Sequence, residues 1–176
     1  MSIEDITIII TSFKSSNKIN SCLDSINRKT KVIIIENSGS YKFKEVVEKK
    51  YQNVECLISK ENLGYAKGNN LGLRKVTTKY ALVLNPDTIL QTDALENFLT
   101  TASKYKDFSL IGPVSNSKDK TNKTGELIEV ENLKGFAIFF NMEKFENHDF
   151  FDEKYFLYFE EIDLCRKVYS NKGKIY

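Results

Sequence analysis

Short apolar runs alternate along the chain with longer segments in which apolar side chains recur at helical spacing. The β-branched runs 6–10 and 32–35 are typical of strands buried on both faces, and strand patterns return at 54–58, 81–84 and 109–114. A helical pattern separates each strand from the next. This alternation predicts an α/β fold with a mostly parallel sheet and helices on both faces.

The pattern changes after residue 114. Residues 115–126 are polar and rich in turn formers, which predicts a mobile surface loop. Segments 127–132 and 133–141 resemble β structure, and an acid-headed helix then leads to a last strand beginning at Lys174. We therefore expect a single domain over residues 1–176, with a smaller mixed β segment near the C-terminus.

Composition narrows the class of protein. The chain is 41% hydrophobic and 28% charged, and no apolar run approaches the roughly 18–20 residues that a membrane span needs. Its first residues include acids where a secretory signal carries positive charge, so we interpret the protein as soluble and cytoplasmic. The net charge of +2 predicts no nucleic-acid partner and leaves open a loose contact with an anionic membrane surface.

Cysteine and histidine content limits the chemistry. The three cysteines, Cys22, Cys56 and Cys165, form no closely spaced pair, so they indicate neither a disulfide framework nor a zinc site. His148 is the single histidine, which excludes mechanisms that need two and disfavours Ser/His/Asp and Cys/His triads. Any chemistry must therefore use carboxylates, amides and lysines.

An acid follows the apolar run at 81–84. Pro86 cannot continue a strand ladder, so Asp87 is expected just past the end of a buried strand. In an open α/β sheet, ligands bind at the carboxyl ends of the strands. Asp87 would place one carboxylate there, although a plain Asn-Pro-Asp turn after a strand is the alternative.

Glycines recur every four residues, at positions 64, 68 and 72, within a helical pattern. Each costs a helix about 1 kcal/mol relative to alanine, so the repeat suggests close approach of the helix backbone to a sheet or to a ligand. This spacing is not GxGxxG, and no such loop follows the first strand. A dinucleotide-dependent dehydrogenase is therefore excluded.

Six segments in a fixed order resemble the inverting glycosyltransferases of family 2, within their rhamnosyltransferase-like branch. They are "TIIITSFKSS", "VIIIENSGS", "NLGYAKGNNLG", "LNPDT", "GFAIFFNMEKF" and "FDEKYFLYFEEIDLC". The resemblance implies the GT-A fold and transfer of a sugar from a UDP, dTDP or GDP donor to a hydroxyl of a glycan or lipid-linked acceptor. It further implies a Mg²⁺ or Mn²⁺ cofactor and a role in cell-surface polysaccharide synthesis, in the cytoplasm or at the inner face of the membrane.

The resemblance also assigns a donor site. "NPD" stands where the family carries its DxD motif, so Asp87 would contact the metal ion and Asn85 would replace the first acid. Two departures are visible: Ser12, Phe13 and Lys14 stand in place of Thr, Tyr and Asn, and Glu36 replaces the commoner aspartate. The residues implied to bind the donor are Ser12, Phe13, Glu36, Asn37, Asn62, Gly64, Lys67, Asn69, Asn70, Asn85, Asp87 and Gly135.

The acids Glu160, Glu161 and Asp163 correspond to the family's ED motif, in which the second residue is the usual general base. Glu161 holds that position here, and it would take the proton from the acceptor hydroxyl. An acidic first helical turn is the structural alternative. Tyr155 and Tyr158 would line the acceptor cleft, unless they belong to the core.

The same resemblance divides the chain by role. Residues 1–114 would form the nucleotide-sugar-binding half and residues 127–176 the acceptor-side half, which is expected to be incomplete because relatives continue past Tyr176. The altered "TSFK" and "ENS" segments favour a second hypothesis, a nucleotide-sugar-binding module that is catalytically impaired. The pattern leaves the sugar, the acceptor and the oligomeric state open.

Overall fold

The computed structural model describes residues 1–113, 127–145, 147 and 149–176. The predicted loop at 115–126 and His148 therefore lie outside the described residues. The helices are α1 (Ile19–Asp24), α2 (Tyr41–Lys50), α3 (Gly64–Leu73), α4 (Ala94–Lys104) and α5 (Glu160–Ser170), with 3₁₀ turns η1 (Ile3–Asp5) and η2 (Met142–Lys144). The strands are β1 (Ile6–Ser12), β2 (Lys31–Glu36), β3 (Val54–Ile58), β4 (Tyr80–Leu84), β5 (Phe108–Ile111), β6 (Ala137–Asn141) and β7 (Lys174–Ile175).

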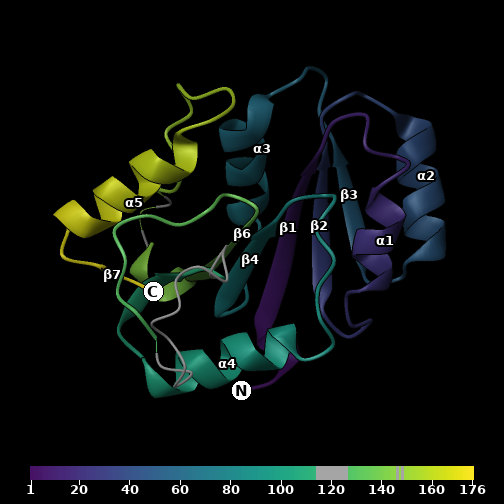
Figure 1. Cartoon of the computed structure of the whole chain (residues 1–176). Coiled ribbons are helices and arrows are strands. Elements are labelled where there is room, and N and C mark those ends of the chain that lie inside the picture. The colour runs from purple at the N-terminus through teal and green to yellow at the C-terminus, as the bar shows by residue number, and fades with distance from the viewer. Residues whose placement is uncertain (114–126, 146, 148) are drawn as a thin grey trace.

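The seven strands of the described residues form one sheet in the order β3-β2-β1-β4-β6-β5-β7 (Figure 1). Strands β3, β2, β1 and β4 are parallel neighbours, joined by helical crossovers. Strand β6 is antiparallel to both β4 and β5, while β5 and β7 are parallel. The predicted α/β fold with a mostly parallel sheet is confirmed, and the expected mixed β segment is part of this same sheet.

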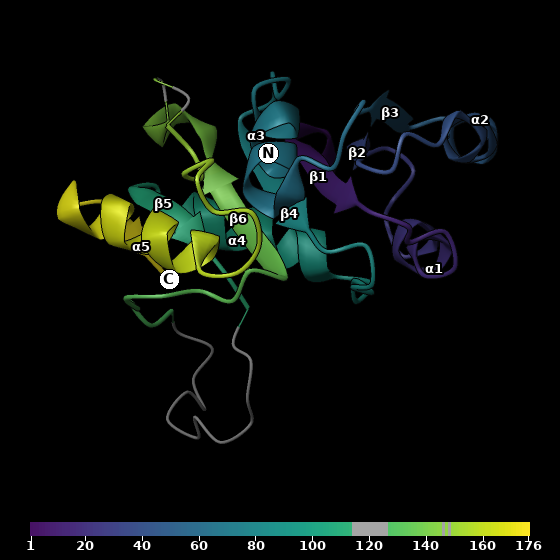
Figure 2. The same cartoon turned by 90° about the horizontal axis from the view of Figure 1, so that it is seen from above.

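Helices cover both faces of the sheet (Figure 2). Side chains of α1, α2 and α4 pack on one face, and side chains of α3 and α5 pack on the other. Alternate residues of each strand point to opposite faces, so Ile8 and Leu82 join the first cluster while Ile9 and Val83 join the second. Because both faces are buried, the central strands are apolar without interruption.

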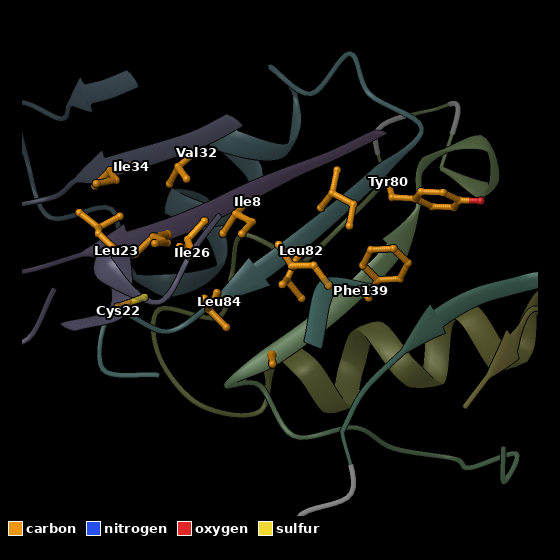
Figure 3. Packing of buried hydrophobic residues seen from close by; sticks show 14 of the residues in the cluster. Ile8, Cys22, Leu23, Ile26, Val32, Ile34, Tyr80, Leu82, Leu84 and Phe139 are labelled. Carbon is orange, nitrogen blue, oxygen red and sulfur yellow. The ribbon is translucent and has the colours of Figure 1, made fainter. Parts of the chain in front are cut away.

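The packing of α1 on the sheet shows how the first face is filled (Figure 3). Cys22, Leu23 and Ile26 lie against strand residues that include Ile8 and Leu84, and all of them are buried. Burial raises the pKa of the Cys22 thiol to about 12. This cysteine is thus a packing residue, as expected for a free buried thiol.

Two glycines of α3 permit its close approach to β1. A Cβ atom on Gly68 would lie 2.7 Å from Cγ2 of Thr11, and one on Gly72 would lie 2.5 Å from Cγ2 of Ile9. Both distances are shorter than real Cβ contacts, so these positions require glycine. The packing explanation therefore accounts for two of the three repeated glycines.

One predicted strand is wrong. Residues 127–132 form no strand, although the backbone N–H of Val130 donates to the carbonyl oxygen of Ile175 at 2.9 Å. Strand β7 is only two residues long, so it offers this segment no ladder to extend. Among the helices of the described residues, none is long and apolar enough to cross a membrane.

Candidate active site

The donor residues predicted from the first two strands do meet at one edge of the sheet. Ser12 and Glu36 are register partners at the ends of β1 and β2. The backbone N–H of Asn37 donates to the carbonyl oxygen of Ser12 at 2.8 Å, which keeps the two chains together beyond the ladder. Phe13 follows Ser12 and is 45% exposed, so its ring is accessible to a ligand.

The Glu36 carboxylate braces the turn that leads into α2. One oxygen accepts hydrogen bonds from the backbone N–H of Ser38, at 3.1 Å, and from the Ser38 hydroxyl, while the other accepts from the N–H of Ser40 at 2.7 Å. The side chain is buried. These contacts explain why an acid is placed here, and contact with a nucleobase stays a prediction.

Asparagines tie the start of α3 to the same edge. The Asn37 amide donates to the carbonyl oxygen of Gly64 at 3.0 Å, and the Thr11 hydroxyl donates to Oδ1 of Asn69 at 2.8 Å. Oδ1 of Asn37 and Oγ of Ser12 are buried without a partner among the described residues. Such atoms cost about 1–3 kcal/mol each, so this edge is suited to a polar ligand or ordered water.

The "NPD" turn lies just past β4, as the sequence predicts. The backbone N–H of Asn85 donates to the carbonyl oxygen of Phe136 at 2.9 Å, and the N–H of Thr88 donates to Asn85 at 3.1 Å, which closes the turn. Asp87 is exposed, with Nζ of Lys18 at 3.5 Å from its carboxylate. Oδ1 of Asn85 is buried and has no partner in the described part of the chain.

These two residues fit a divalent cation shared with a ligand. In the described ranges, no group of three or more His, Cys, Asp or Glu residues is arranged to hold a metal ion. Asp87 and Asn85 instead offer one carboxylate and one unpartnered amide oxygen, which are hard donors suited to Mg²⁺ or Mn²⁺. The remaining coordination would come from ligand oxygens and water.

The segment Gly135–Phe136 connects this turn to the acid cluster. Phe136 accepts the hydrogen bond from Asn85, and a Cβ atom on Gly135 would lie 3.7 Å from the side chain of Glu161. The hydroxyl of Tyr65 donates to the carbonyl oxygen of Gly135 at 2.5 Å. Glu161, Gly135 and the "NPD" turn, far apart in sequence, are therefore brought together.

Tyr65 is a site residue that the sequence analysis did not identify. Its pKa is raised first by burial and then by the nearby carboxylates of Glu160 and Glu161. The phenol is therefore a stable neutral donor that holds the backbone of Gly135. The sequence does show a tyrosine within the glycine-rich segment 64–72. The glycine spacing alone does not indicate that this tyrosine contacts Gly135.

The structure separates the candidate acids. Glu161 lies against Gly135, whereas Asp163, two residues further along α5, lines a hollow of about 570 Å³ with Asp152 and Arg166. Two helical residues correspond to about 200° of rotation, so the two acids point to different sides of α5. Neither this hollow nor one of about 510 Å³ beside Lys172 is lined by Glu161. The geometry favours Glu161 over Asp163 as the acid nearest the donor edge.

Glu160 differs from both. Its side chain is buried, and its Oε2 atom has no partner among the described residues. Burial, with a further contribution from Glu161, raises the pKa of Glu160 above its ordinary value of 4.5. The folded protein therefore binds a proton at this carboxyl more tightly than the unfolded chain does.

We expect Glu160→Gln to stabilise the protein more at about pH 7 than at about pH 4. A raised folded-state pKa means that stability is complete below the unfolded-state value and is lost as the pH rises through the folded-state value. Glutamine keeps the shape without this loss, so its gain in Tm should be larger at the higher pH, by about 2–4 °C for each 1 kcal/mol of difference. Thermal unfolding followed by circular dichroism at both pH values measures the difference. The exposed Glu45→Gln change is the control, and an equal gain at both pH values would contradict the assignment.

The remaining predicted donor residues are placed less uniformly. Oδ1 of Asn62 accepts from the N–H of Gly64 at 3.1 Å in the turn before α3, and Lys67 is exposed on that helix. Asn70 is buried, and its side-chain hydrogen bonds within the described ranges go to Phe151 and Glu153. The structure therefore brings Asn70 to the segment that precedes α5 and not to the residues around Ser12.

The two tyrosines named for an acceptor cleft also differ. Tyr155 is partly buried and packs against the second core cluster, so the core alternative applies to it. Tyr158 is 71% exposed and lies next to Phe159, the N-cap residue of α5. It is the better placed of the two to contact a ligand.

Comparison with known proteins extends this picture. The sequence model of glycosyl transferase family 2 matches residues 7–165. The low-salt glycan biosynthesis hexosyltransferase Agl10 of Haloferax volcanii is 24% identical over 193 residues, which cover 94% of this chain and 62% of the relative.

Solved structures share the fold at low identity. The mannosyltransferase PcManGT from Pyrobaculum calidifontis, in complex with GDP-Man and Mn²⁺, superposes with a TM-score of 0.81 at 16% identity, covering 97% of this chain and 53% of that one. TarS 1–349 from S. aureus gives 0.75 at 15% identity, covering 97% and 57%. The chain thus spans between 53% and 62% of the length of these relatives. The fold is GT-A, and the chain belongs to glycosyl transferase family 2.

Proposed function

We propose that this protein is an inverting, metal-dependent glycosyltransferase that moves a sugar from a nucleotide diphosphate to a hydroxyl of a glycan or lipid-linked acceptor. The observation that carries the proposal is the contact of Gly135–Phe136 with both Glu161 and Asn85. It unites a candidate proton acceptor with a candidate cation site at the carboxyl edge of the sheet, where α/β folds bind ligands. Family membership supports the class of reaction.

The donor would lie across the ends of β1, β2 and β4. Phe13 offers an exposed ring to the base, and the unpartnered atoms of Ser12 and Asn37 offer hydrogen bonds to the nucleoside. Asp87 and Asn85 would hold a divalent ion, which neutralises charge on the diphosphate as it leaves. Lys18, now beside Asp87, is positioned to contact the phosphates.

Glu161 would act as the general base. Its carboxylate accepts the proton of the acceptor hydroxyl while the hydroxyl oxygen bonds to the anomeric carbon. The bond from that carbon to the diphosphate oxygen breaks on the opposite side, and its electron pair leaves with the nucleotide. A single displacement of this kind inverts the anomeric configuration without an enzyme-bound sugar.

The names of the relatives support the type of ligand. PcManGT was solved with GDP-Man and Mn²⁺, TarS was solved with UDP-GlcNAc, and Agl10 is a hexosyltransferase of glycan biosynthesis. By analogy with these proteins, we propose that this chain also binds a nucleotide-sugar donor and a divalent cation. The rhamnosyltransferase-like branch, a role in cell-surface polysaccharide synthesis at the cytoplasmic side of the membrane, and the division into donor-side and acceptor-side halves remain parts of the proposal.

A second candidate function is a nucleotide-sugar-binding module with impaired turnover. Glu36 favours this second function. Its carboxylate accepts hydrogen bonds from Ser38 and Ser40 and is therefore less available to a nucleobase. Asn85 favours it too, because an amide binds a cation more weakly than the acid it replaces. Both functions include binding of a nucleotide sugar, but only the transferase turns it over at an ordinary rate.

A ligand screen tests both. We expect UDP or GDP, or a sugar derivative of either, to raise the Tm of the chain with Mn²⁺ present and to raise it less with EDTA. A ligand at about 100 times its Kd adds about 2.7 kcal/mol, which a thermal-shift assay resolves easily. A separate assay measures release of nucleotide from the sugar nucleotide, with water as the acceptor of the sugar. Release supports the transferase, and binding alone supports the module. Absence of any shift with all nucleotides would refute both.

A further inference from the structure

The segment that precedes α5 lies along α3 (Figure 1). Residues 149–159 link the end of the β6 region to Glu160 and Glu161, so their path determines where the first turn of α5 begins. This path is not a helix or strand, and Tyr158 and Phe159 both have φ values of 71°, which are strained for residues with a side chain. Such a segment keeps its position only if other groups hold it.

Asn70 supplies the central polar contacts. Its amide nitrogen donates to the carbonyl oxygen of Phe151 at 2.8 Å and to a carboxylate oxygen of Glu153 at 3.2 Å. Its oxygen accepts from the backbone N–H of Phe151 at 3.1 Å. The side chain is 1% exposed, so it satisfies both backbone groups of Phe151 in place of water.

Contacts on both sides extend this attachment. Arg74, one helical turn after Asn70, pairs with Glu153 at 2.7 Å. At the other end of α3, the N–H of Tyr65 donates to the carbonyl oxygen of Phe156 at 2.8 Å. Gly64 has a φ of 75°, and a Cβ atom there would clash with the same carbonyl.

Asn69 provides an internal comparison. It is equally buried in the same helix, yet its side chain meets Thr11 of β1 at the donor edge. Two adjacent asparagines, about 100° apart around α3, therefore contact different neighbours. The first contacts the donor side, and the second contacts the segment that delivers the catalytic acids.

We propose that Asn70 is a positioning residue that holds segment 151–156 against α3 and thereby sets Glu161 beside Gly135. It would contact neither donor nor acceptor. The proposal rests on the proposed function, because Glu161 is the base only in that function.

The test compares Asn70→Ala with Asn69→Ala in the 176-residue chain. The measurements are the affinity for UDP and GDP with Mn²⁺, the rate of nucleotide release from saturating UDP-GlcNAc or GDP-mannose, and amide hydrogen exchange. For Asn70→Ala we expect release at least tenfold slower, nucleotide affinity within about twofold of the parent, and faster exchange in 151–159. For Asn69→Ala we expect weaker nucleotide binding and unchanged exchange in that segment.

Two results would overturn the proposal. One is unchanged exchange and unchanged release in Asn70→Ala, and the other is a tenfold loss of nucleotide affinity with the saturated release rate intact, which would make Asn70 a donor-binding residue. If Asn70→Ala does not fold, Glu153→Gln weakens only the outer contact, and it should raise exchange in 151–156 and slow release by about two- to fivefold. No change in that variant would equally overturn the proposal. A parent chain that releases no nucleotide would refute the transferase, while the exchange measurements would still decide whether Asn70 holds the segment.

Discussion

Replacing Asp87 by alanine should remove the Mn²⁺-dependent part of nucleotide affinity and leave the fold intact. The residue lies past the end of β4 and is exposed, so its side chain contributes little to the core. A contact to a charged group contributes about 1.5–3 kcal/mol, which corresponds to a loss of about 10- to 150-fold in Kd. Titration calorimetry with UDP and GDP, with Mn²⁺ and with EDTA, measures that loss.

Two further variants make the result specific. Asp93→Ala removes another exposed acid, one that makes no capping hydrogen bond to the described residues, and should leave the Mn²⁺-dependent affinity unchanged. Asp87→Asn keeps the shape and loses the charge, so its affinity should fall between those of the parent and Asp87→Ala. Equal Mn²⁺-dependent affinity in the parent and in Asp87→Ala would remove this residue from the metal site.

Glu161→Gln should lower the rate of sugar transfer by about 100-fold or more while donor affinity is retained. A positioned general base contributes about 10²–10⁴-fold, and glutamine fills the same space beside Gly135 without accepting the proton. Because the proposed donor contacts lie at the ends of β1, β2 and β4, nucleotide affinity should not change. The rate of nucleotide release from a saturating donor sugar, with water as the acceptor of the sugar, and nucleotide affinity measured separately, test both parts.

Asp163→Asn is the matched control for the general base. Asp163 lines the hollow on another side of α5, together with Arg166, so the variant should keep most of its turnover. A larger loss in Asp163→Asn than in Glu161→Gln would assign the base to Asp163. Equal losses with weakened nucleotide binding would instead indicate that the helix start had moved.

The central strands were predictable because their signal is local. A strand buried on both faces must be apolar at every position, and the predicted 54–58 agrees with β3 (Val54–Ile58). The place of Asp87 beyond β4 followed from Pro86 in the same way. These conclusions need only neighbouring residues, so no knowledge of tertiary contacts was required.

The partners of the polar side chains were not predictable in this way. The sequence shows Asn69 and Asn70 as an adjacent pair, and only the packed helix reveals that one meets Thr11 and the other meets Phe151. The hydrogen bond of Tyr65 to Gly135 likewise joins residues that are distant in the chain. Such contacts depend on how α3, β6 and α5 pack together, which hydrophobic periodicity does not encode.

The position of β6 has a consequence for how the protein folds. Strand β4 pairs with β6, although β5 comes between them in sequence, so Leu84 must find Ala137 across a long connection. Closing such a loop lowers the entropy of the chain before stabilising contacts form. We therefore expect this pairing to form after the β1–β4 unit has assembled. Changes in β6 should then mainly accelerate unfolding, whereas changes in β1 should slow refolding. Because Gly135 and Phe136 lead directly into β6, the edge that carries the candidate site would become native only after the β1–β4 unit.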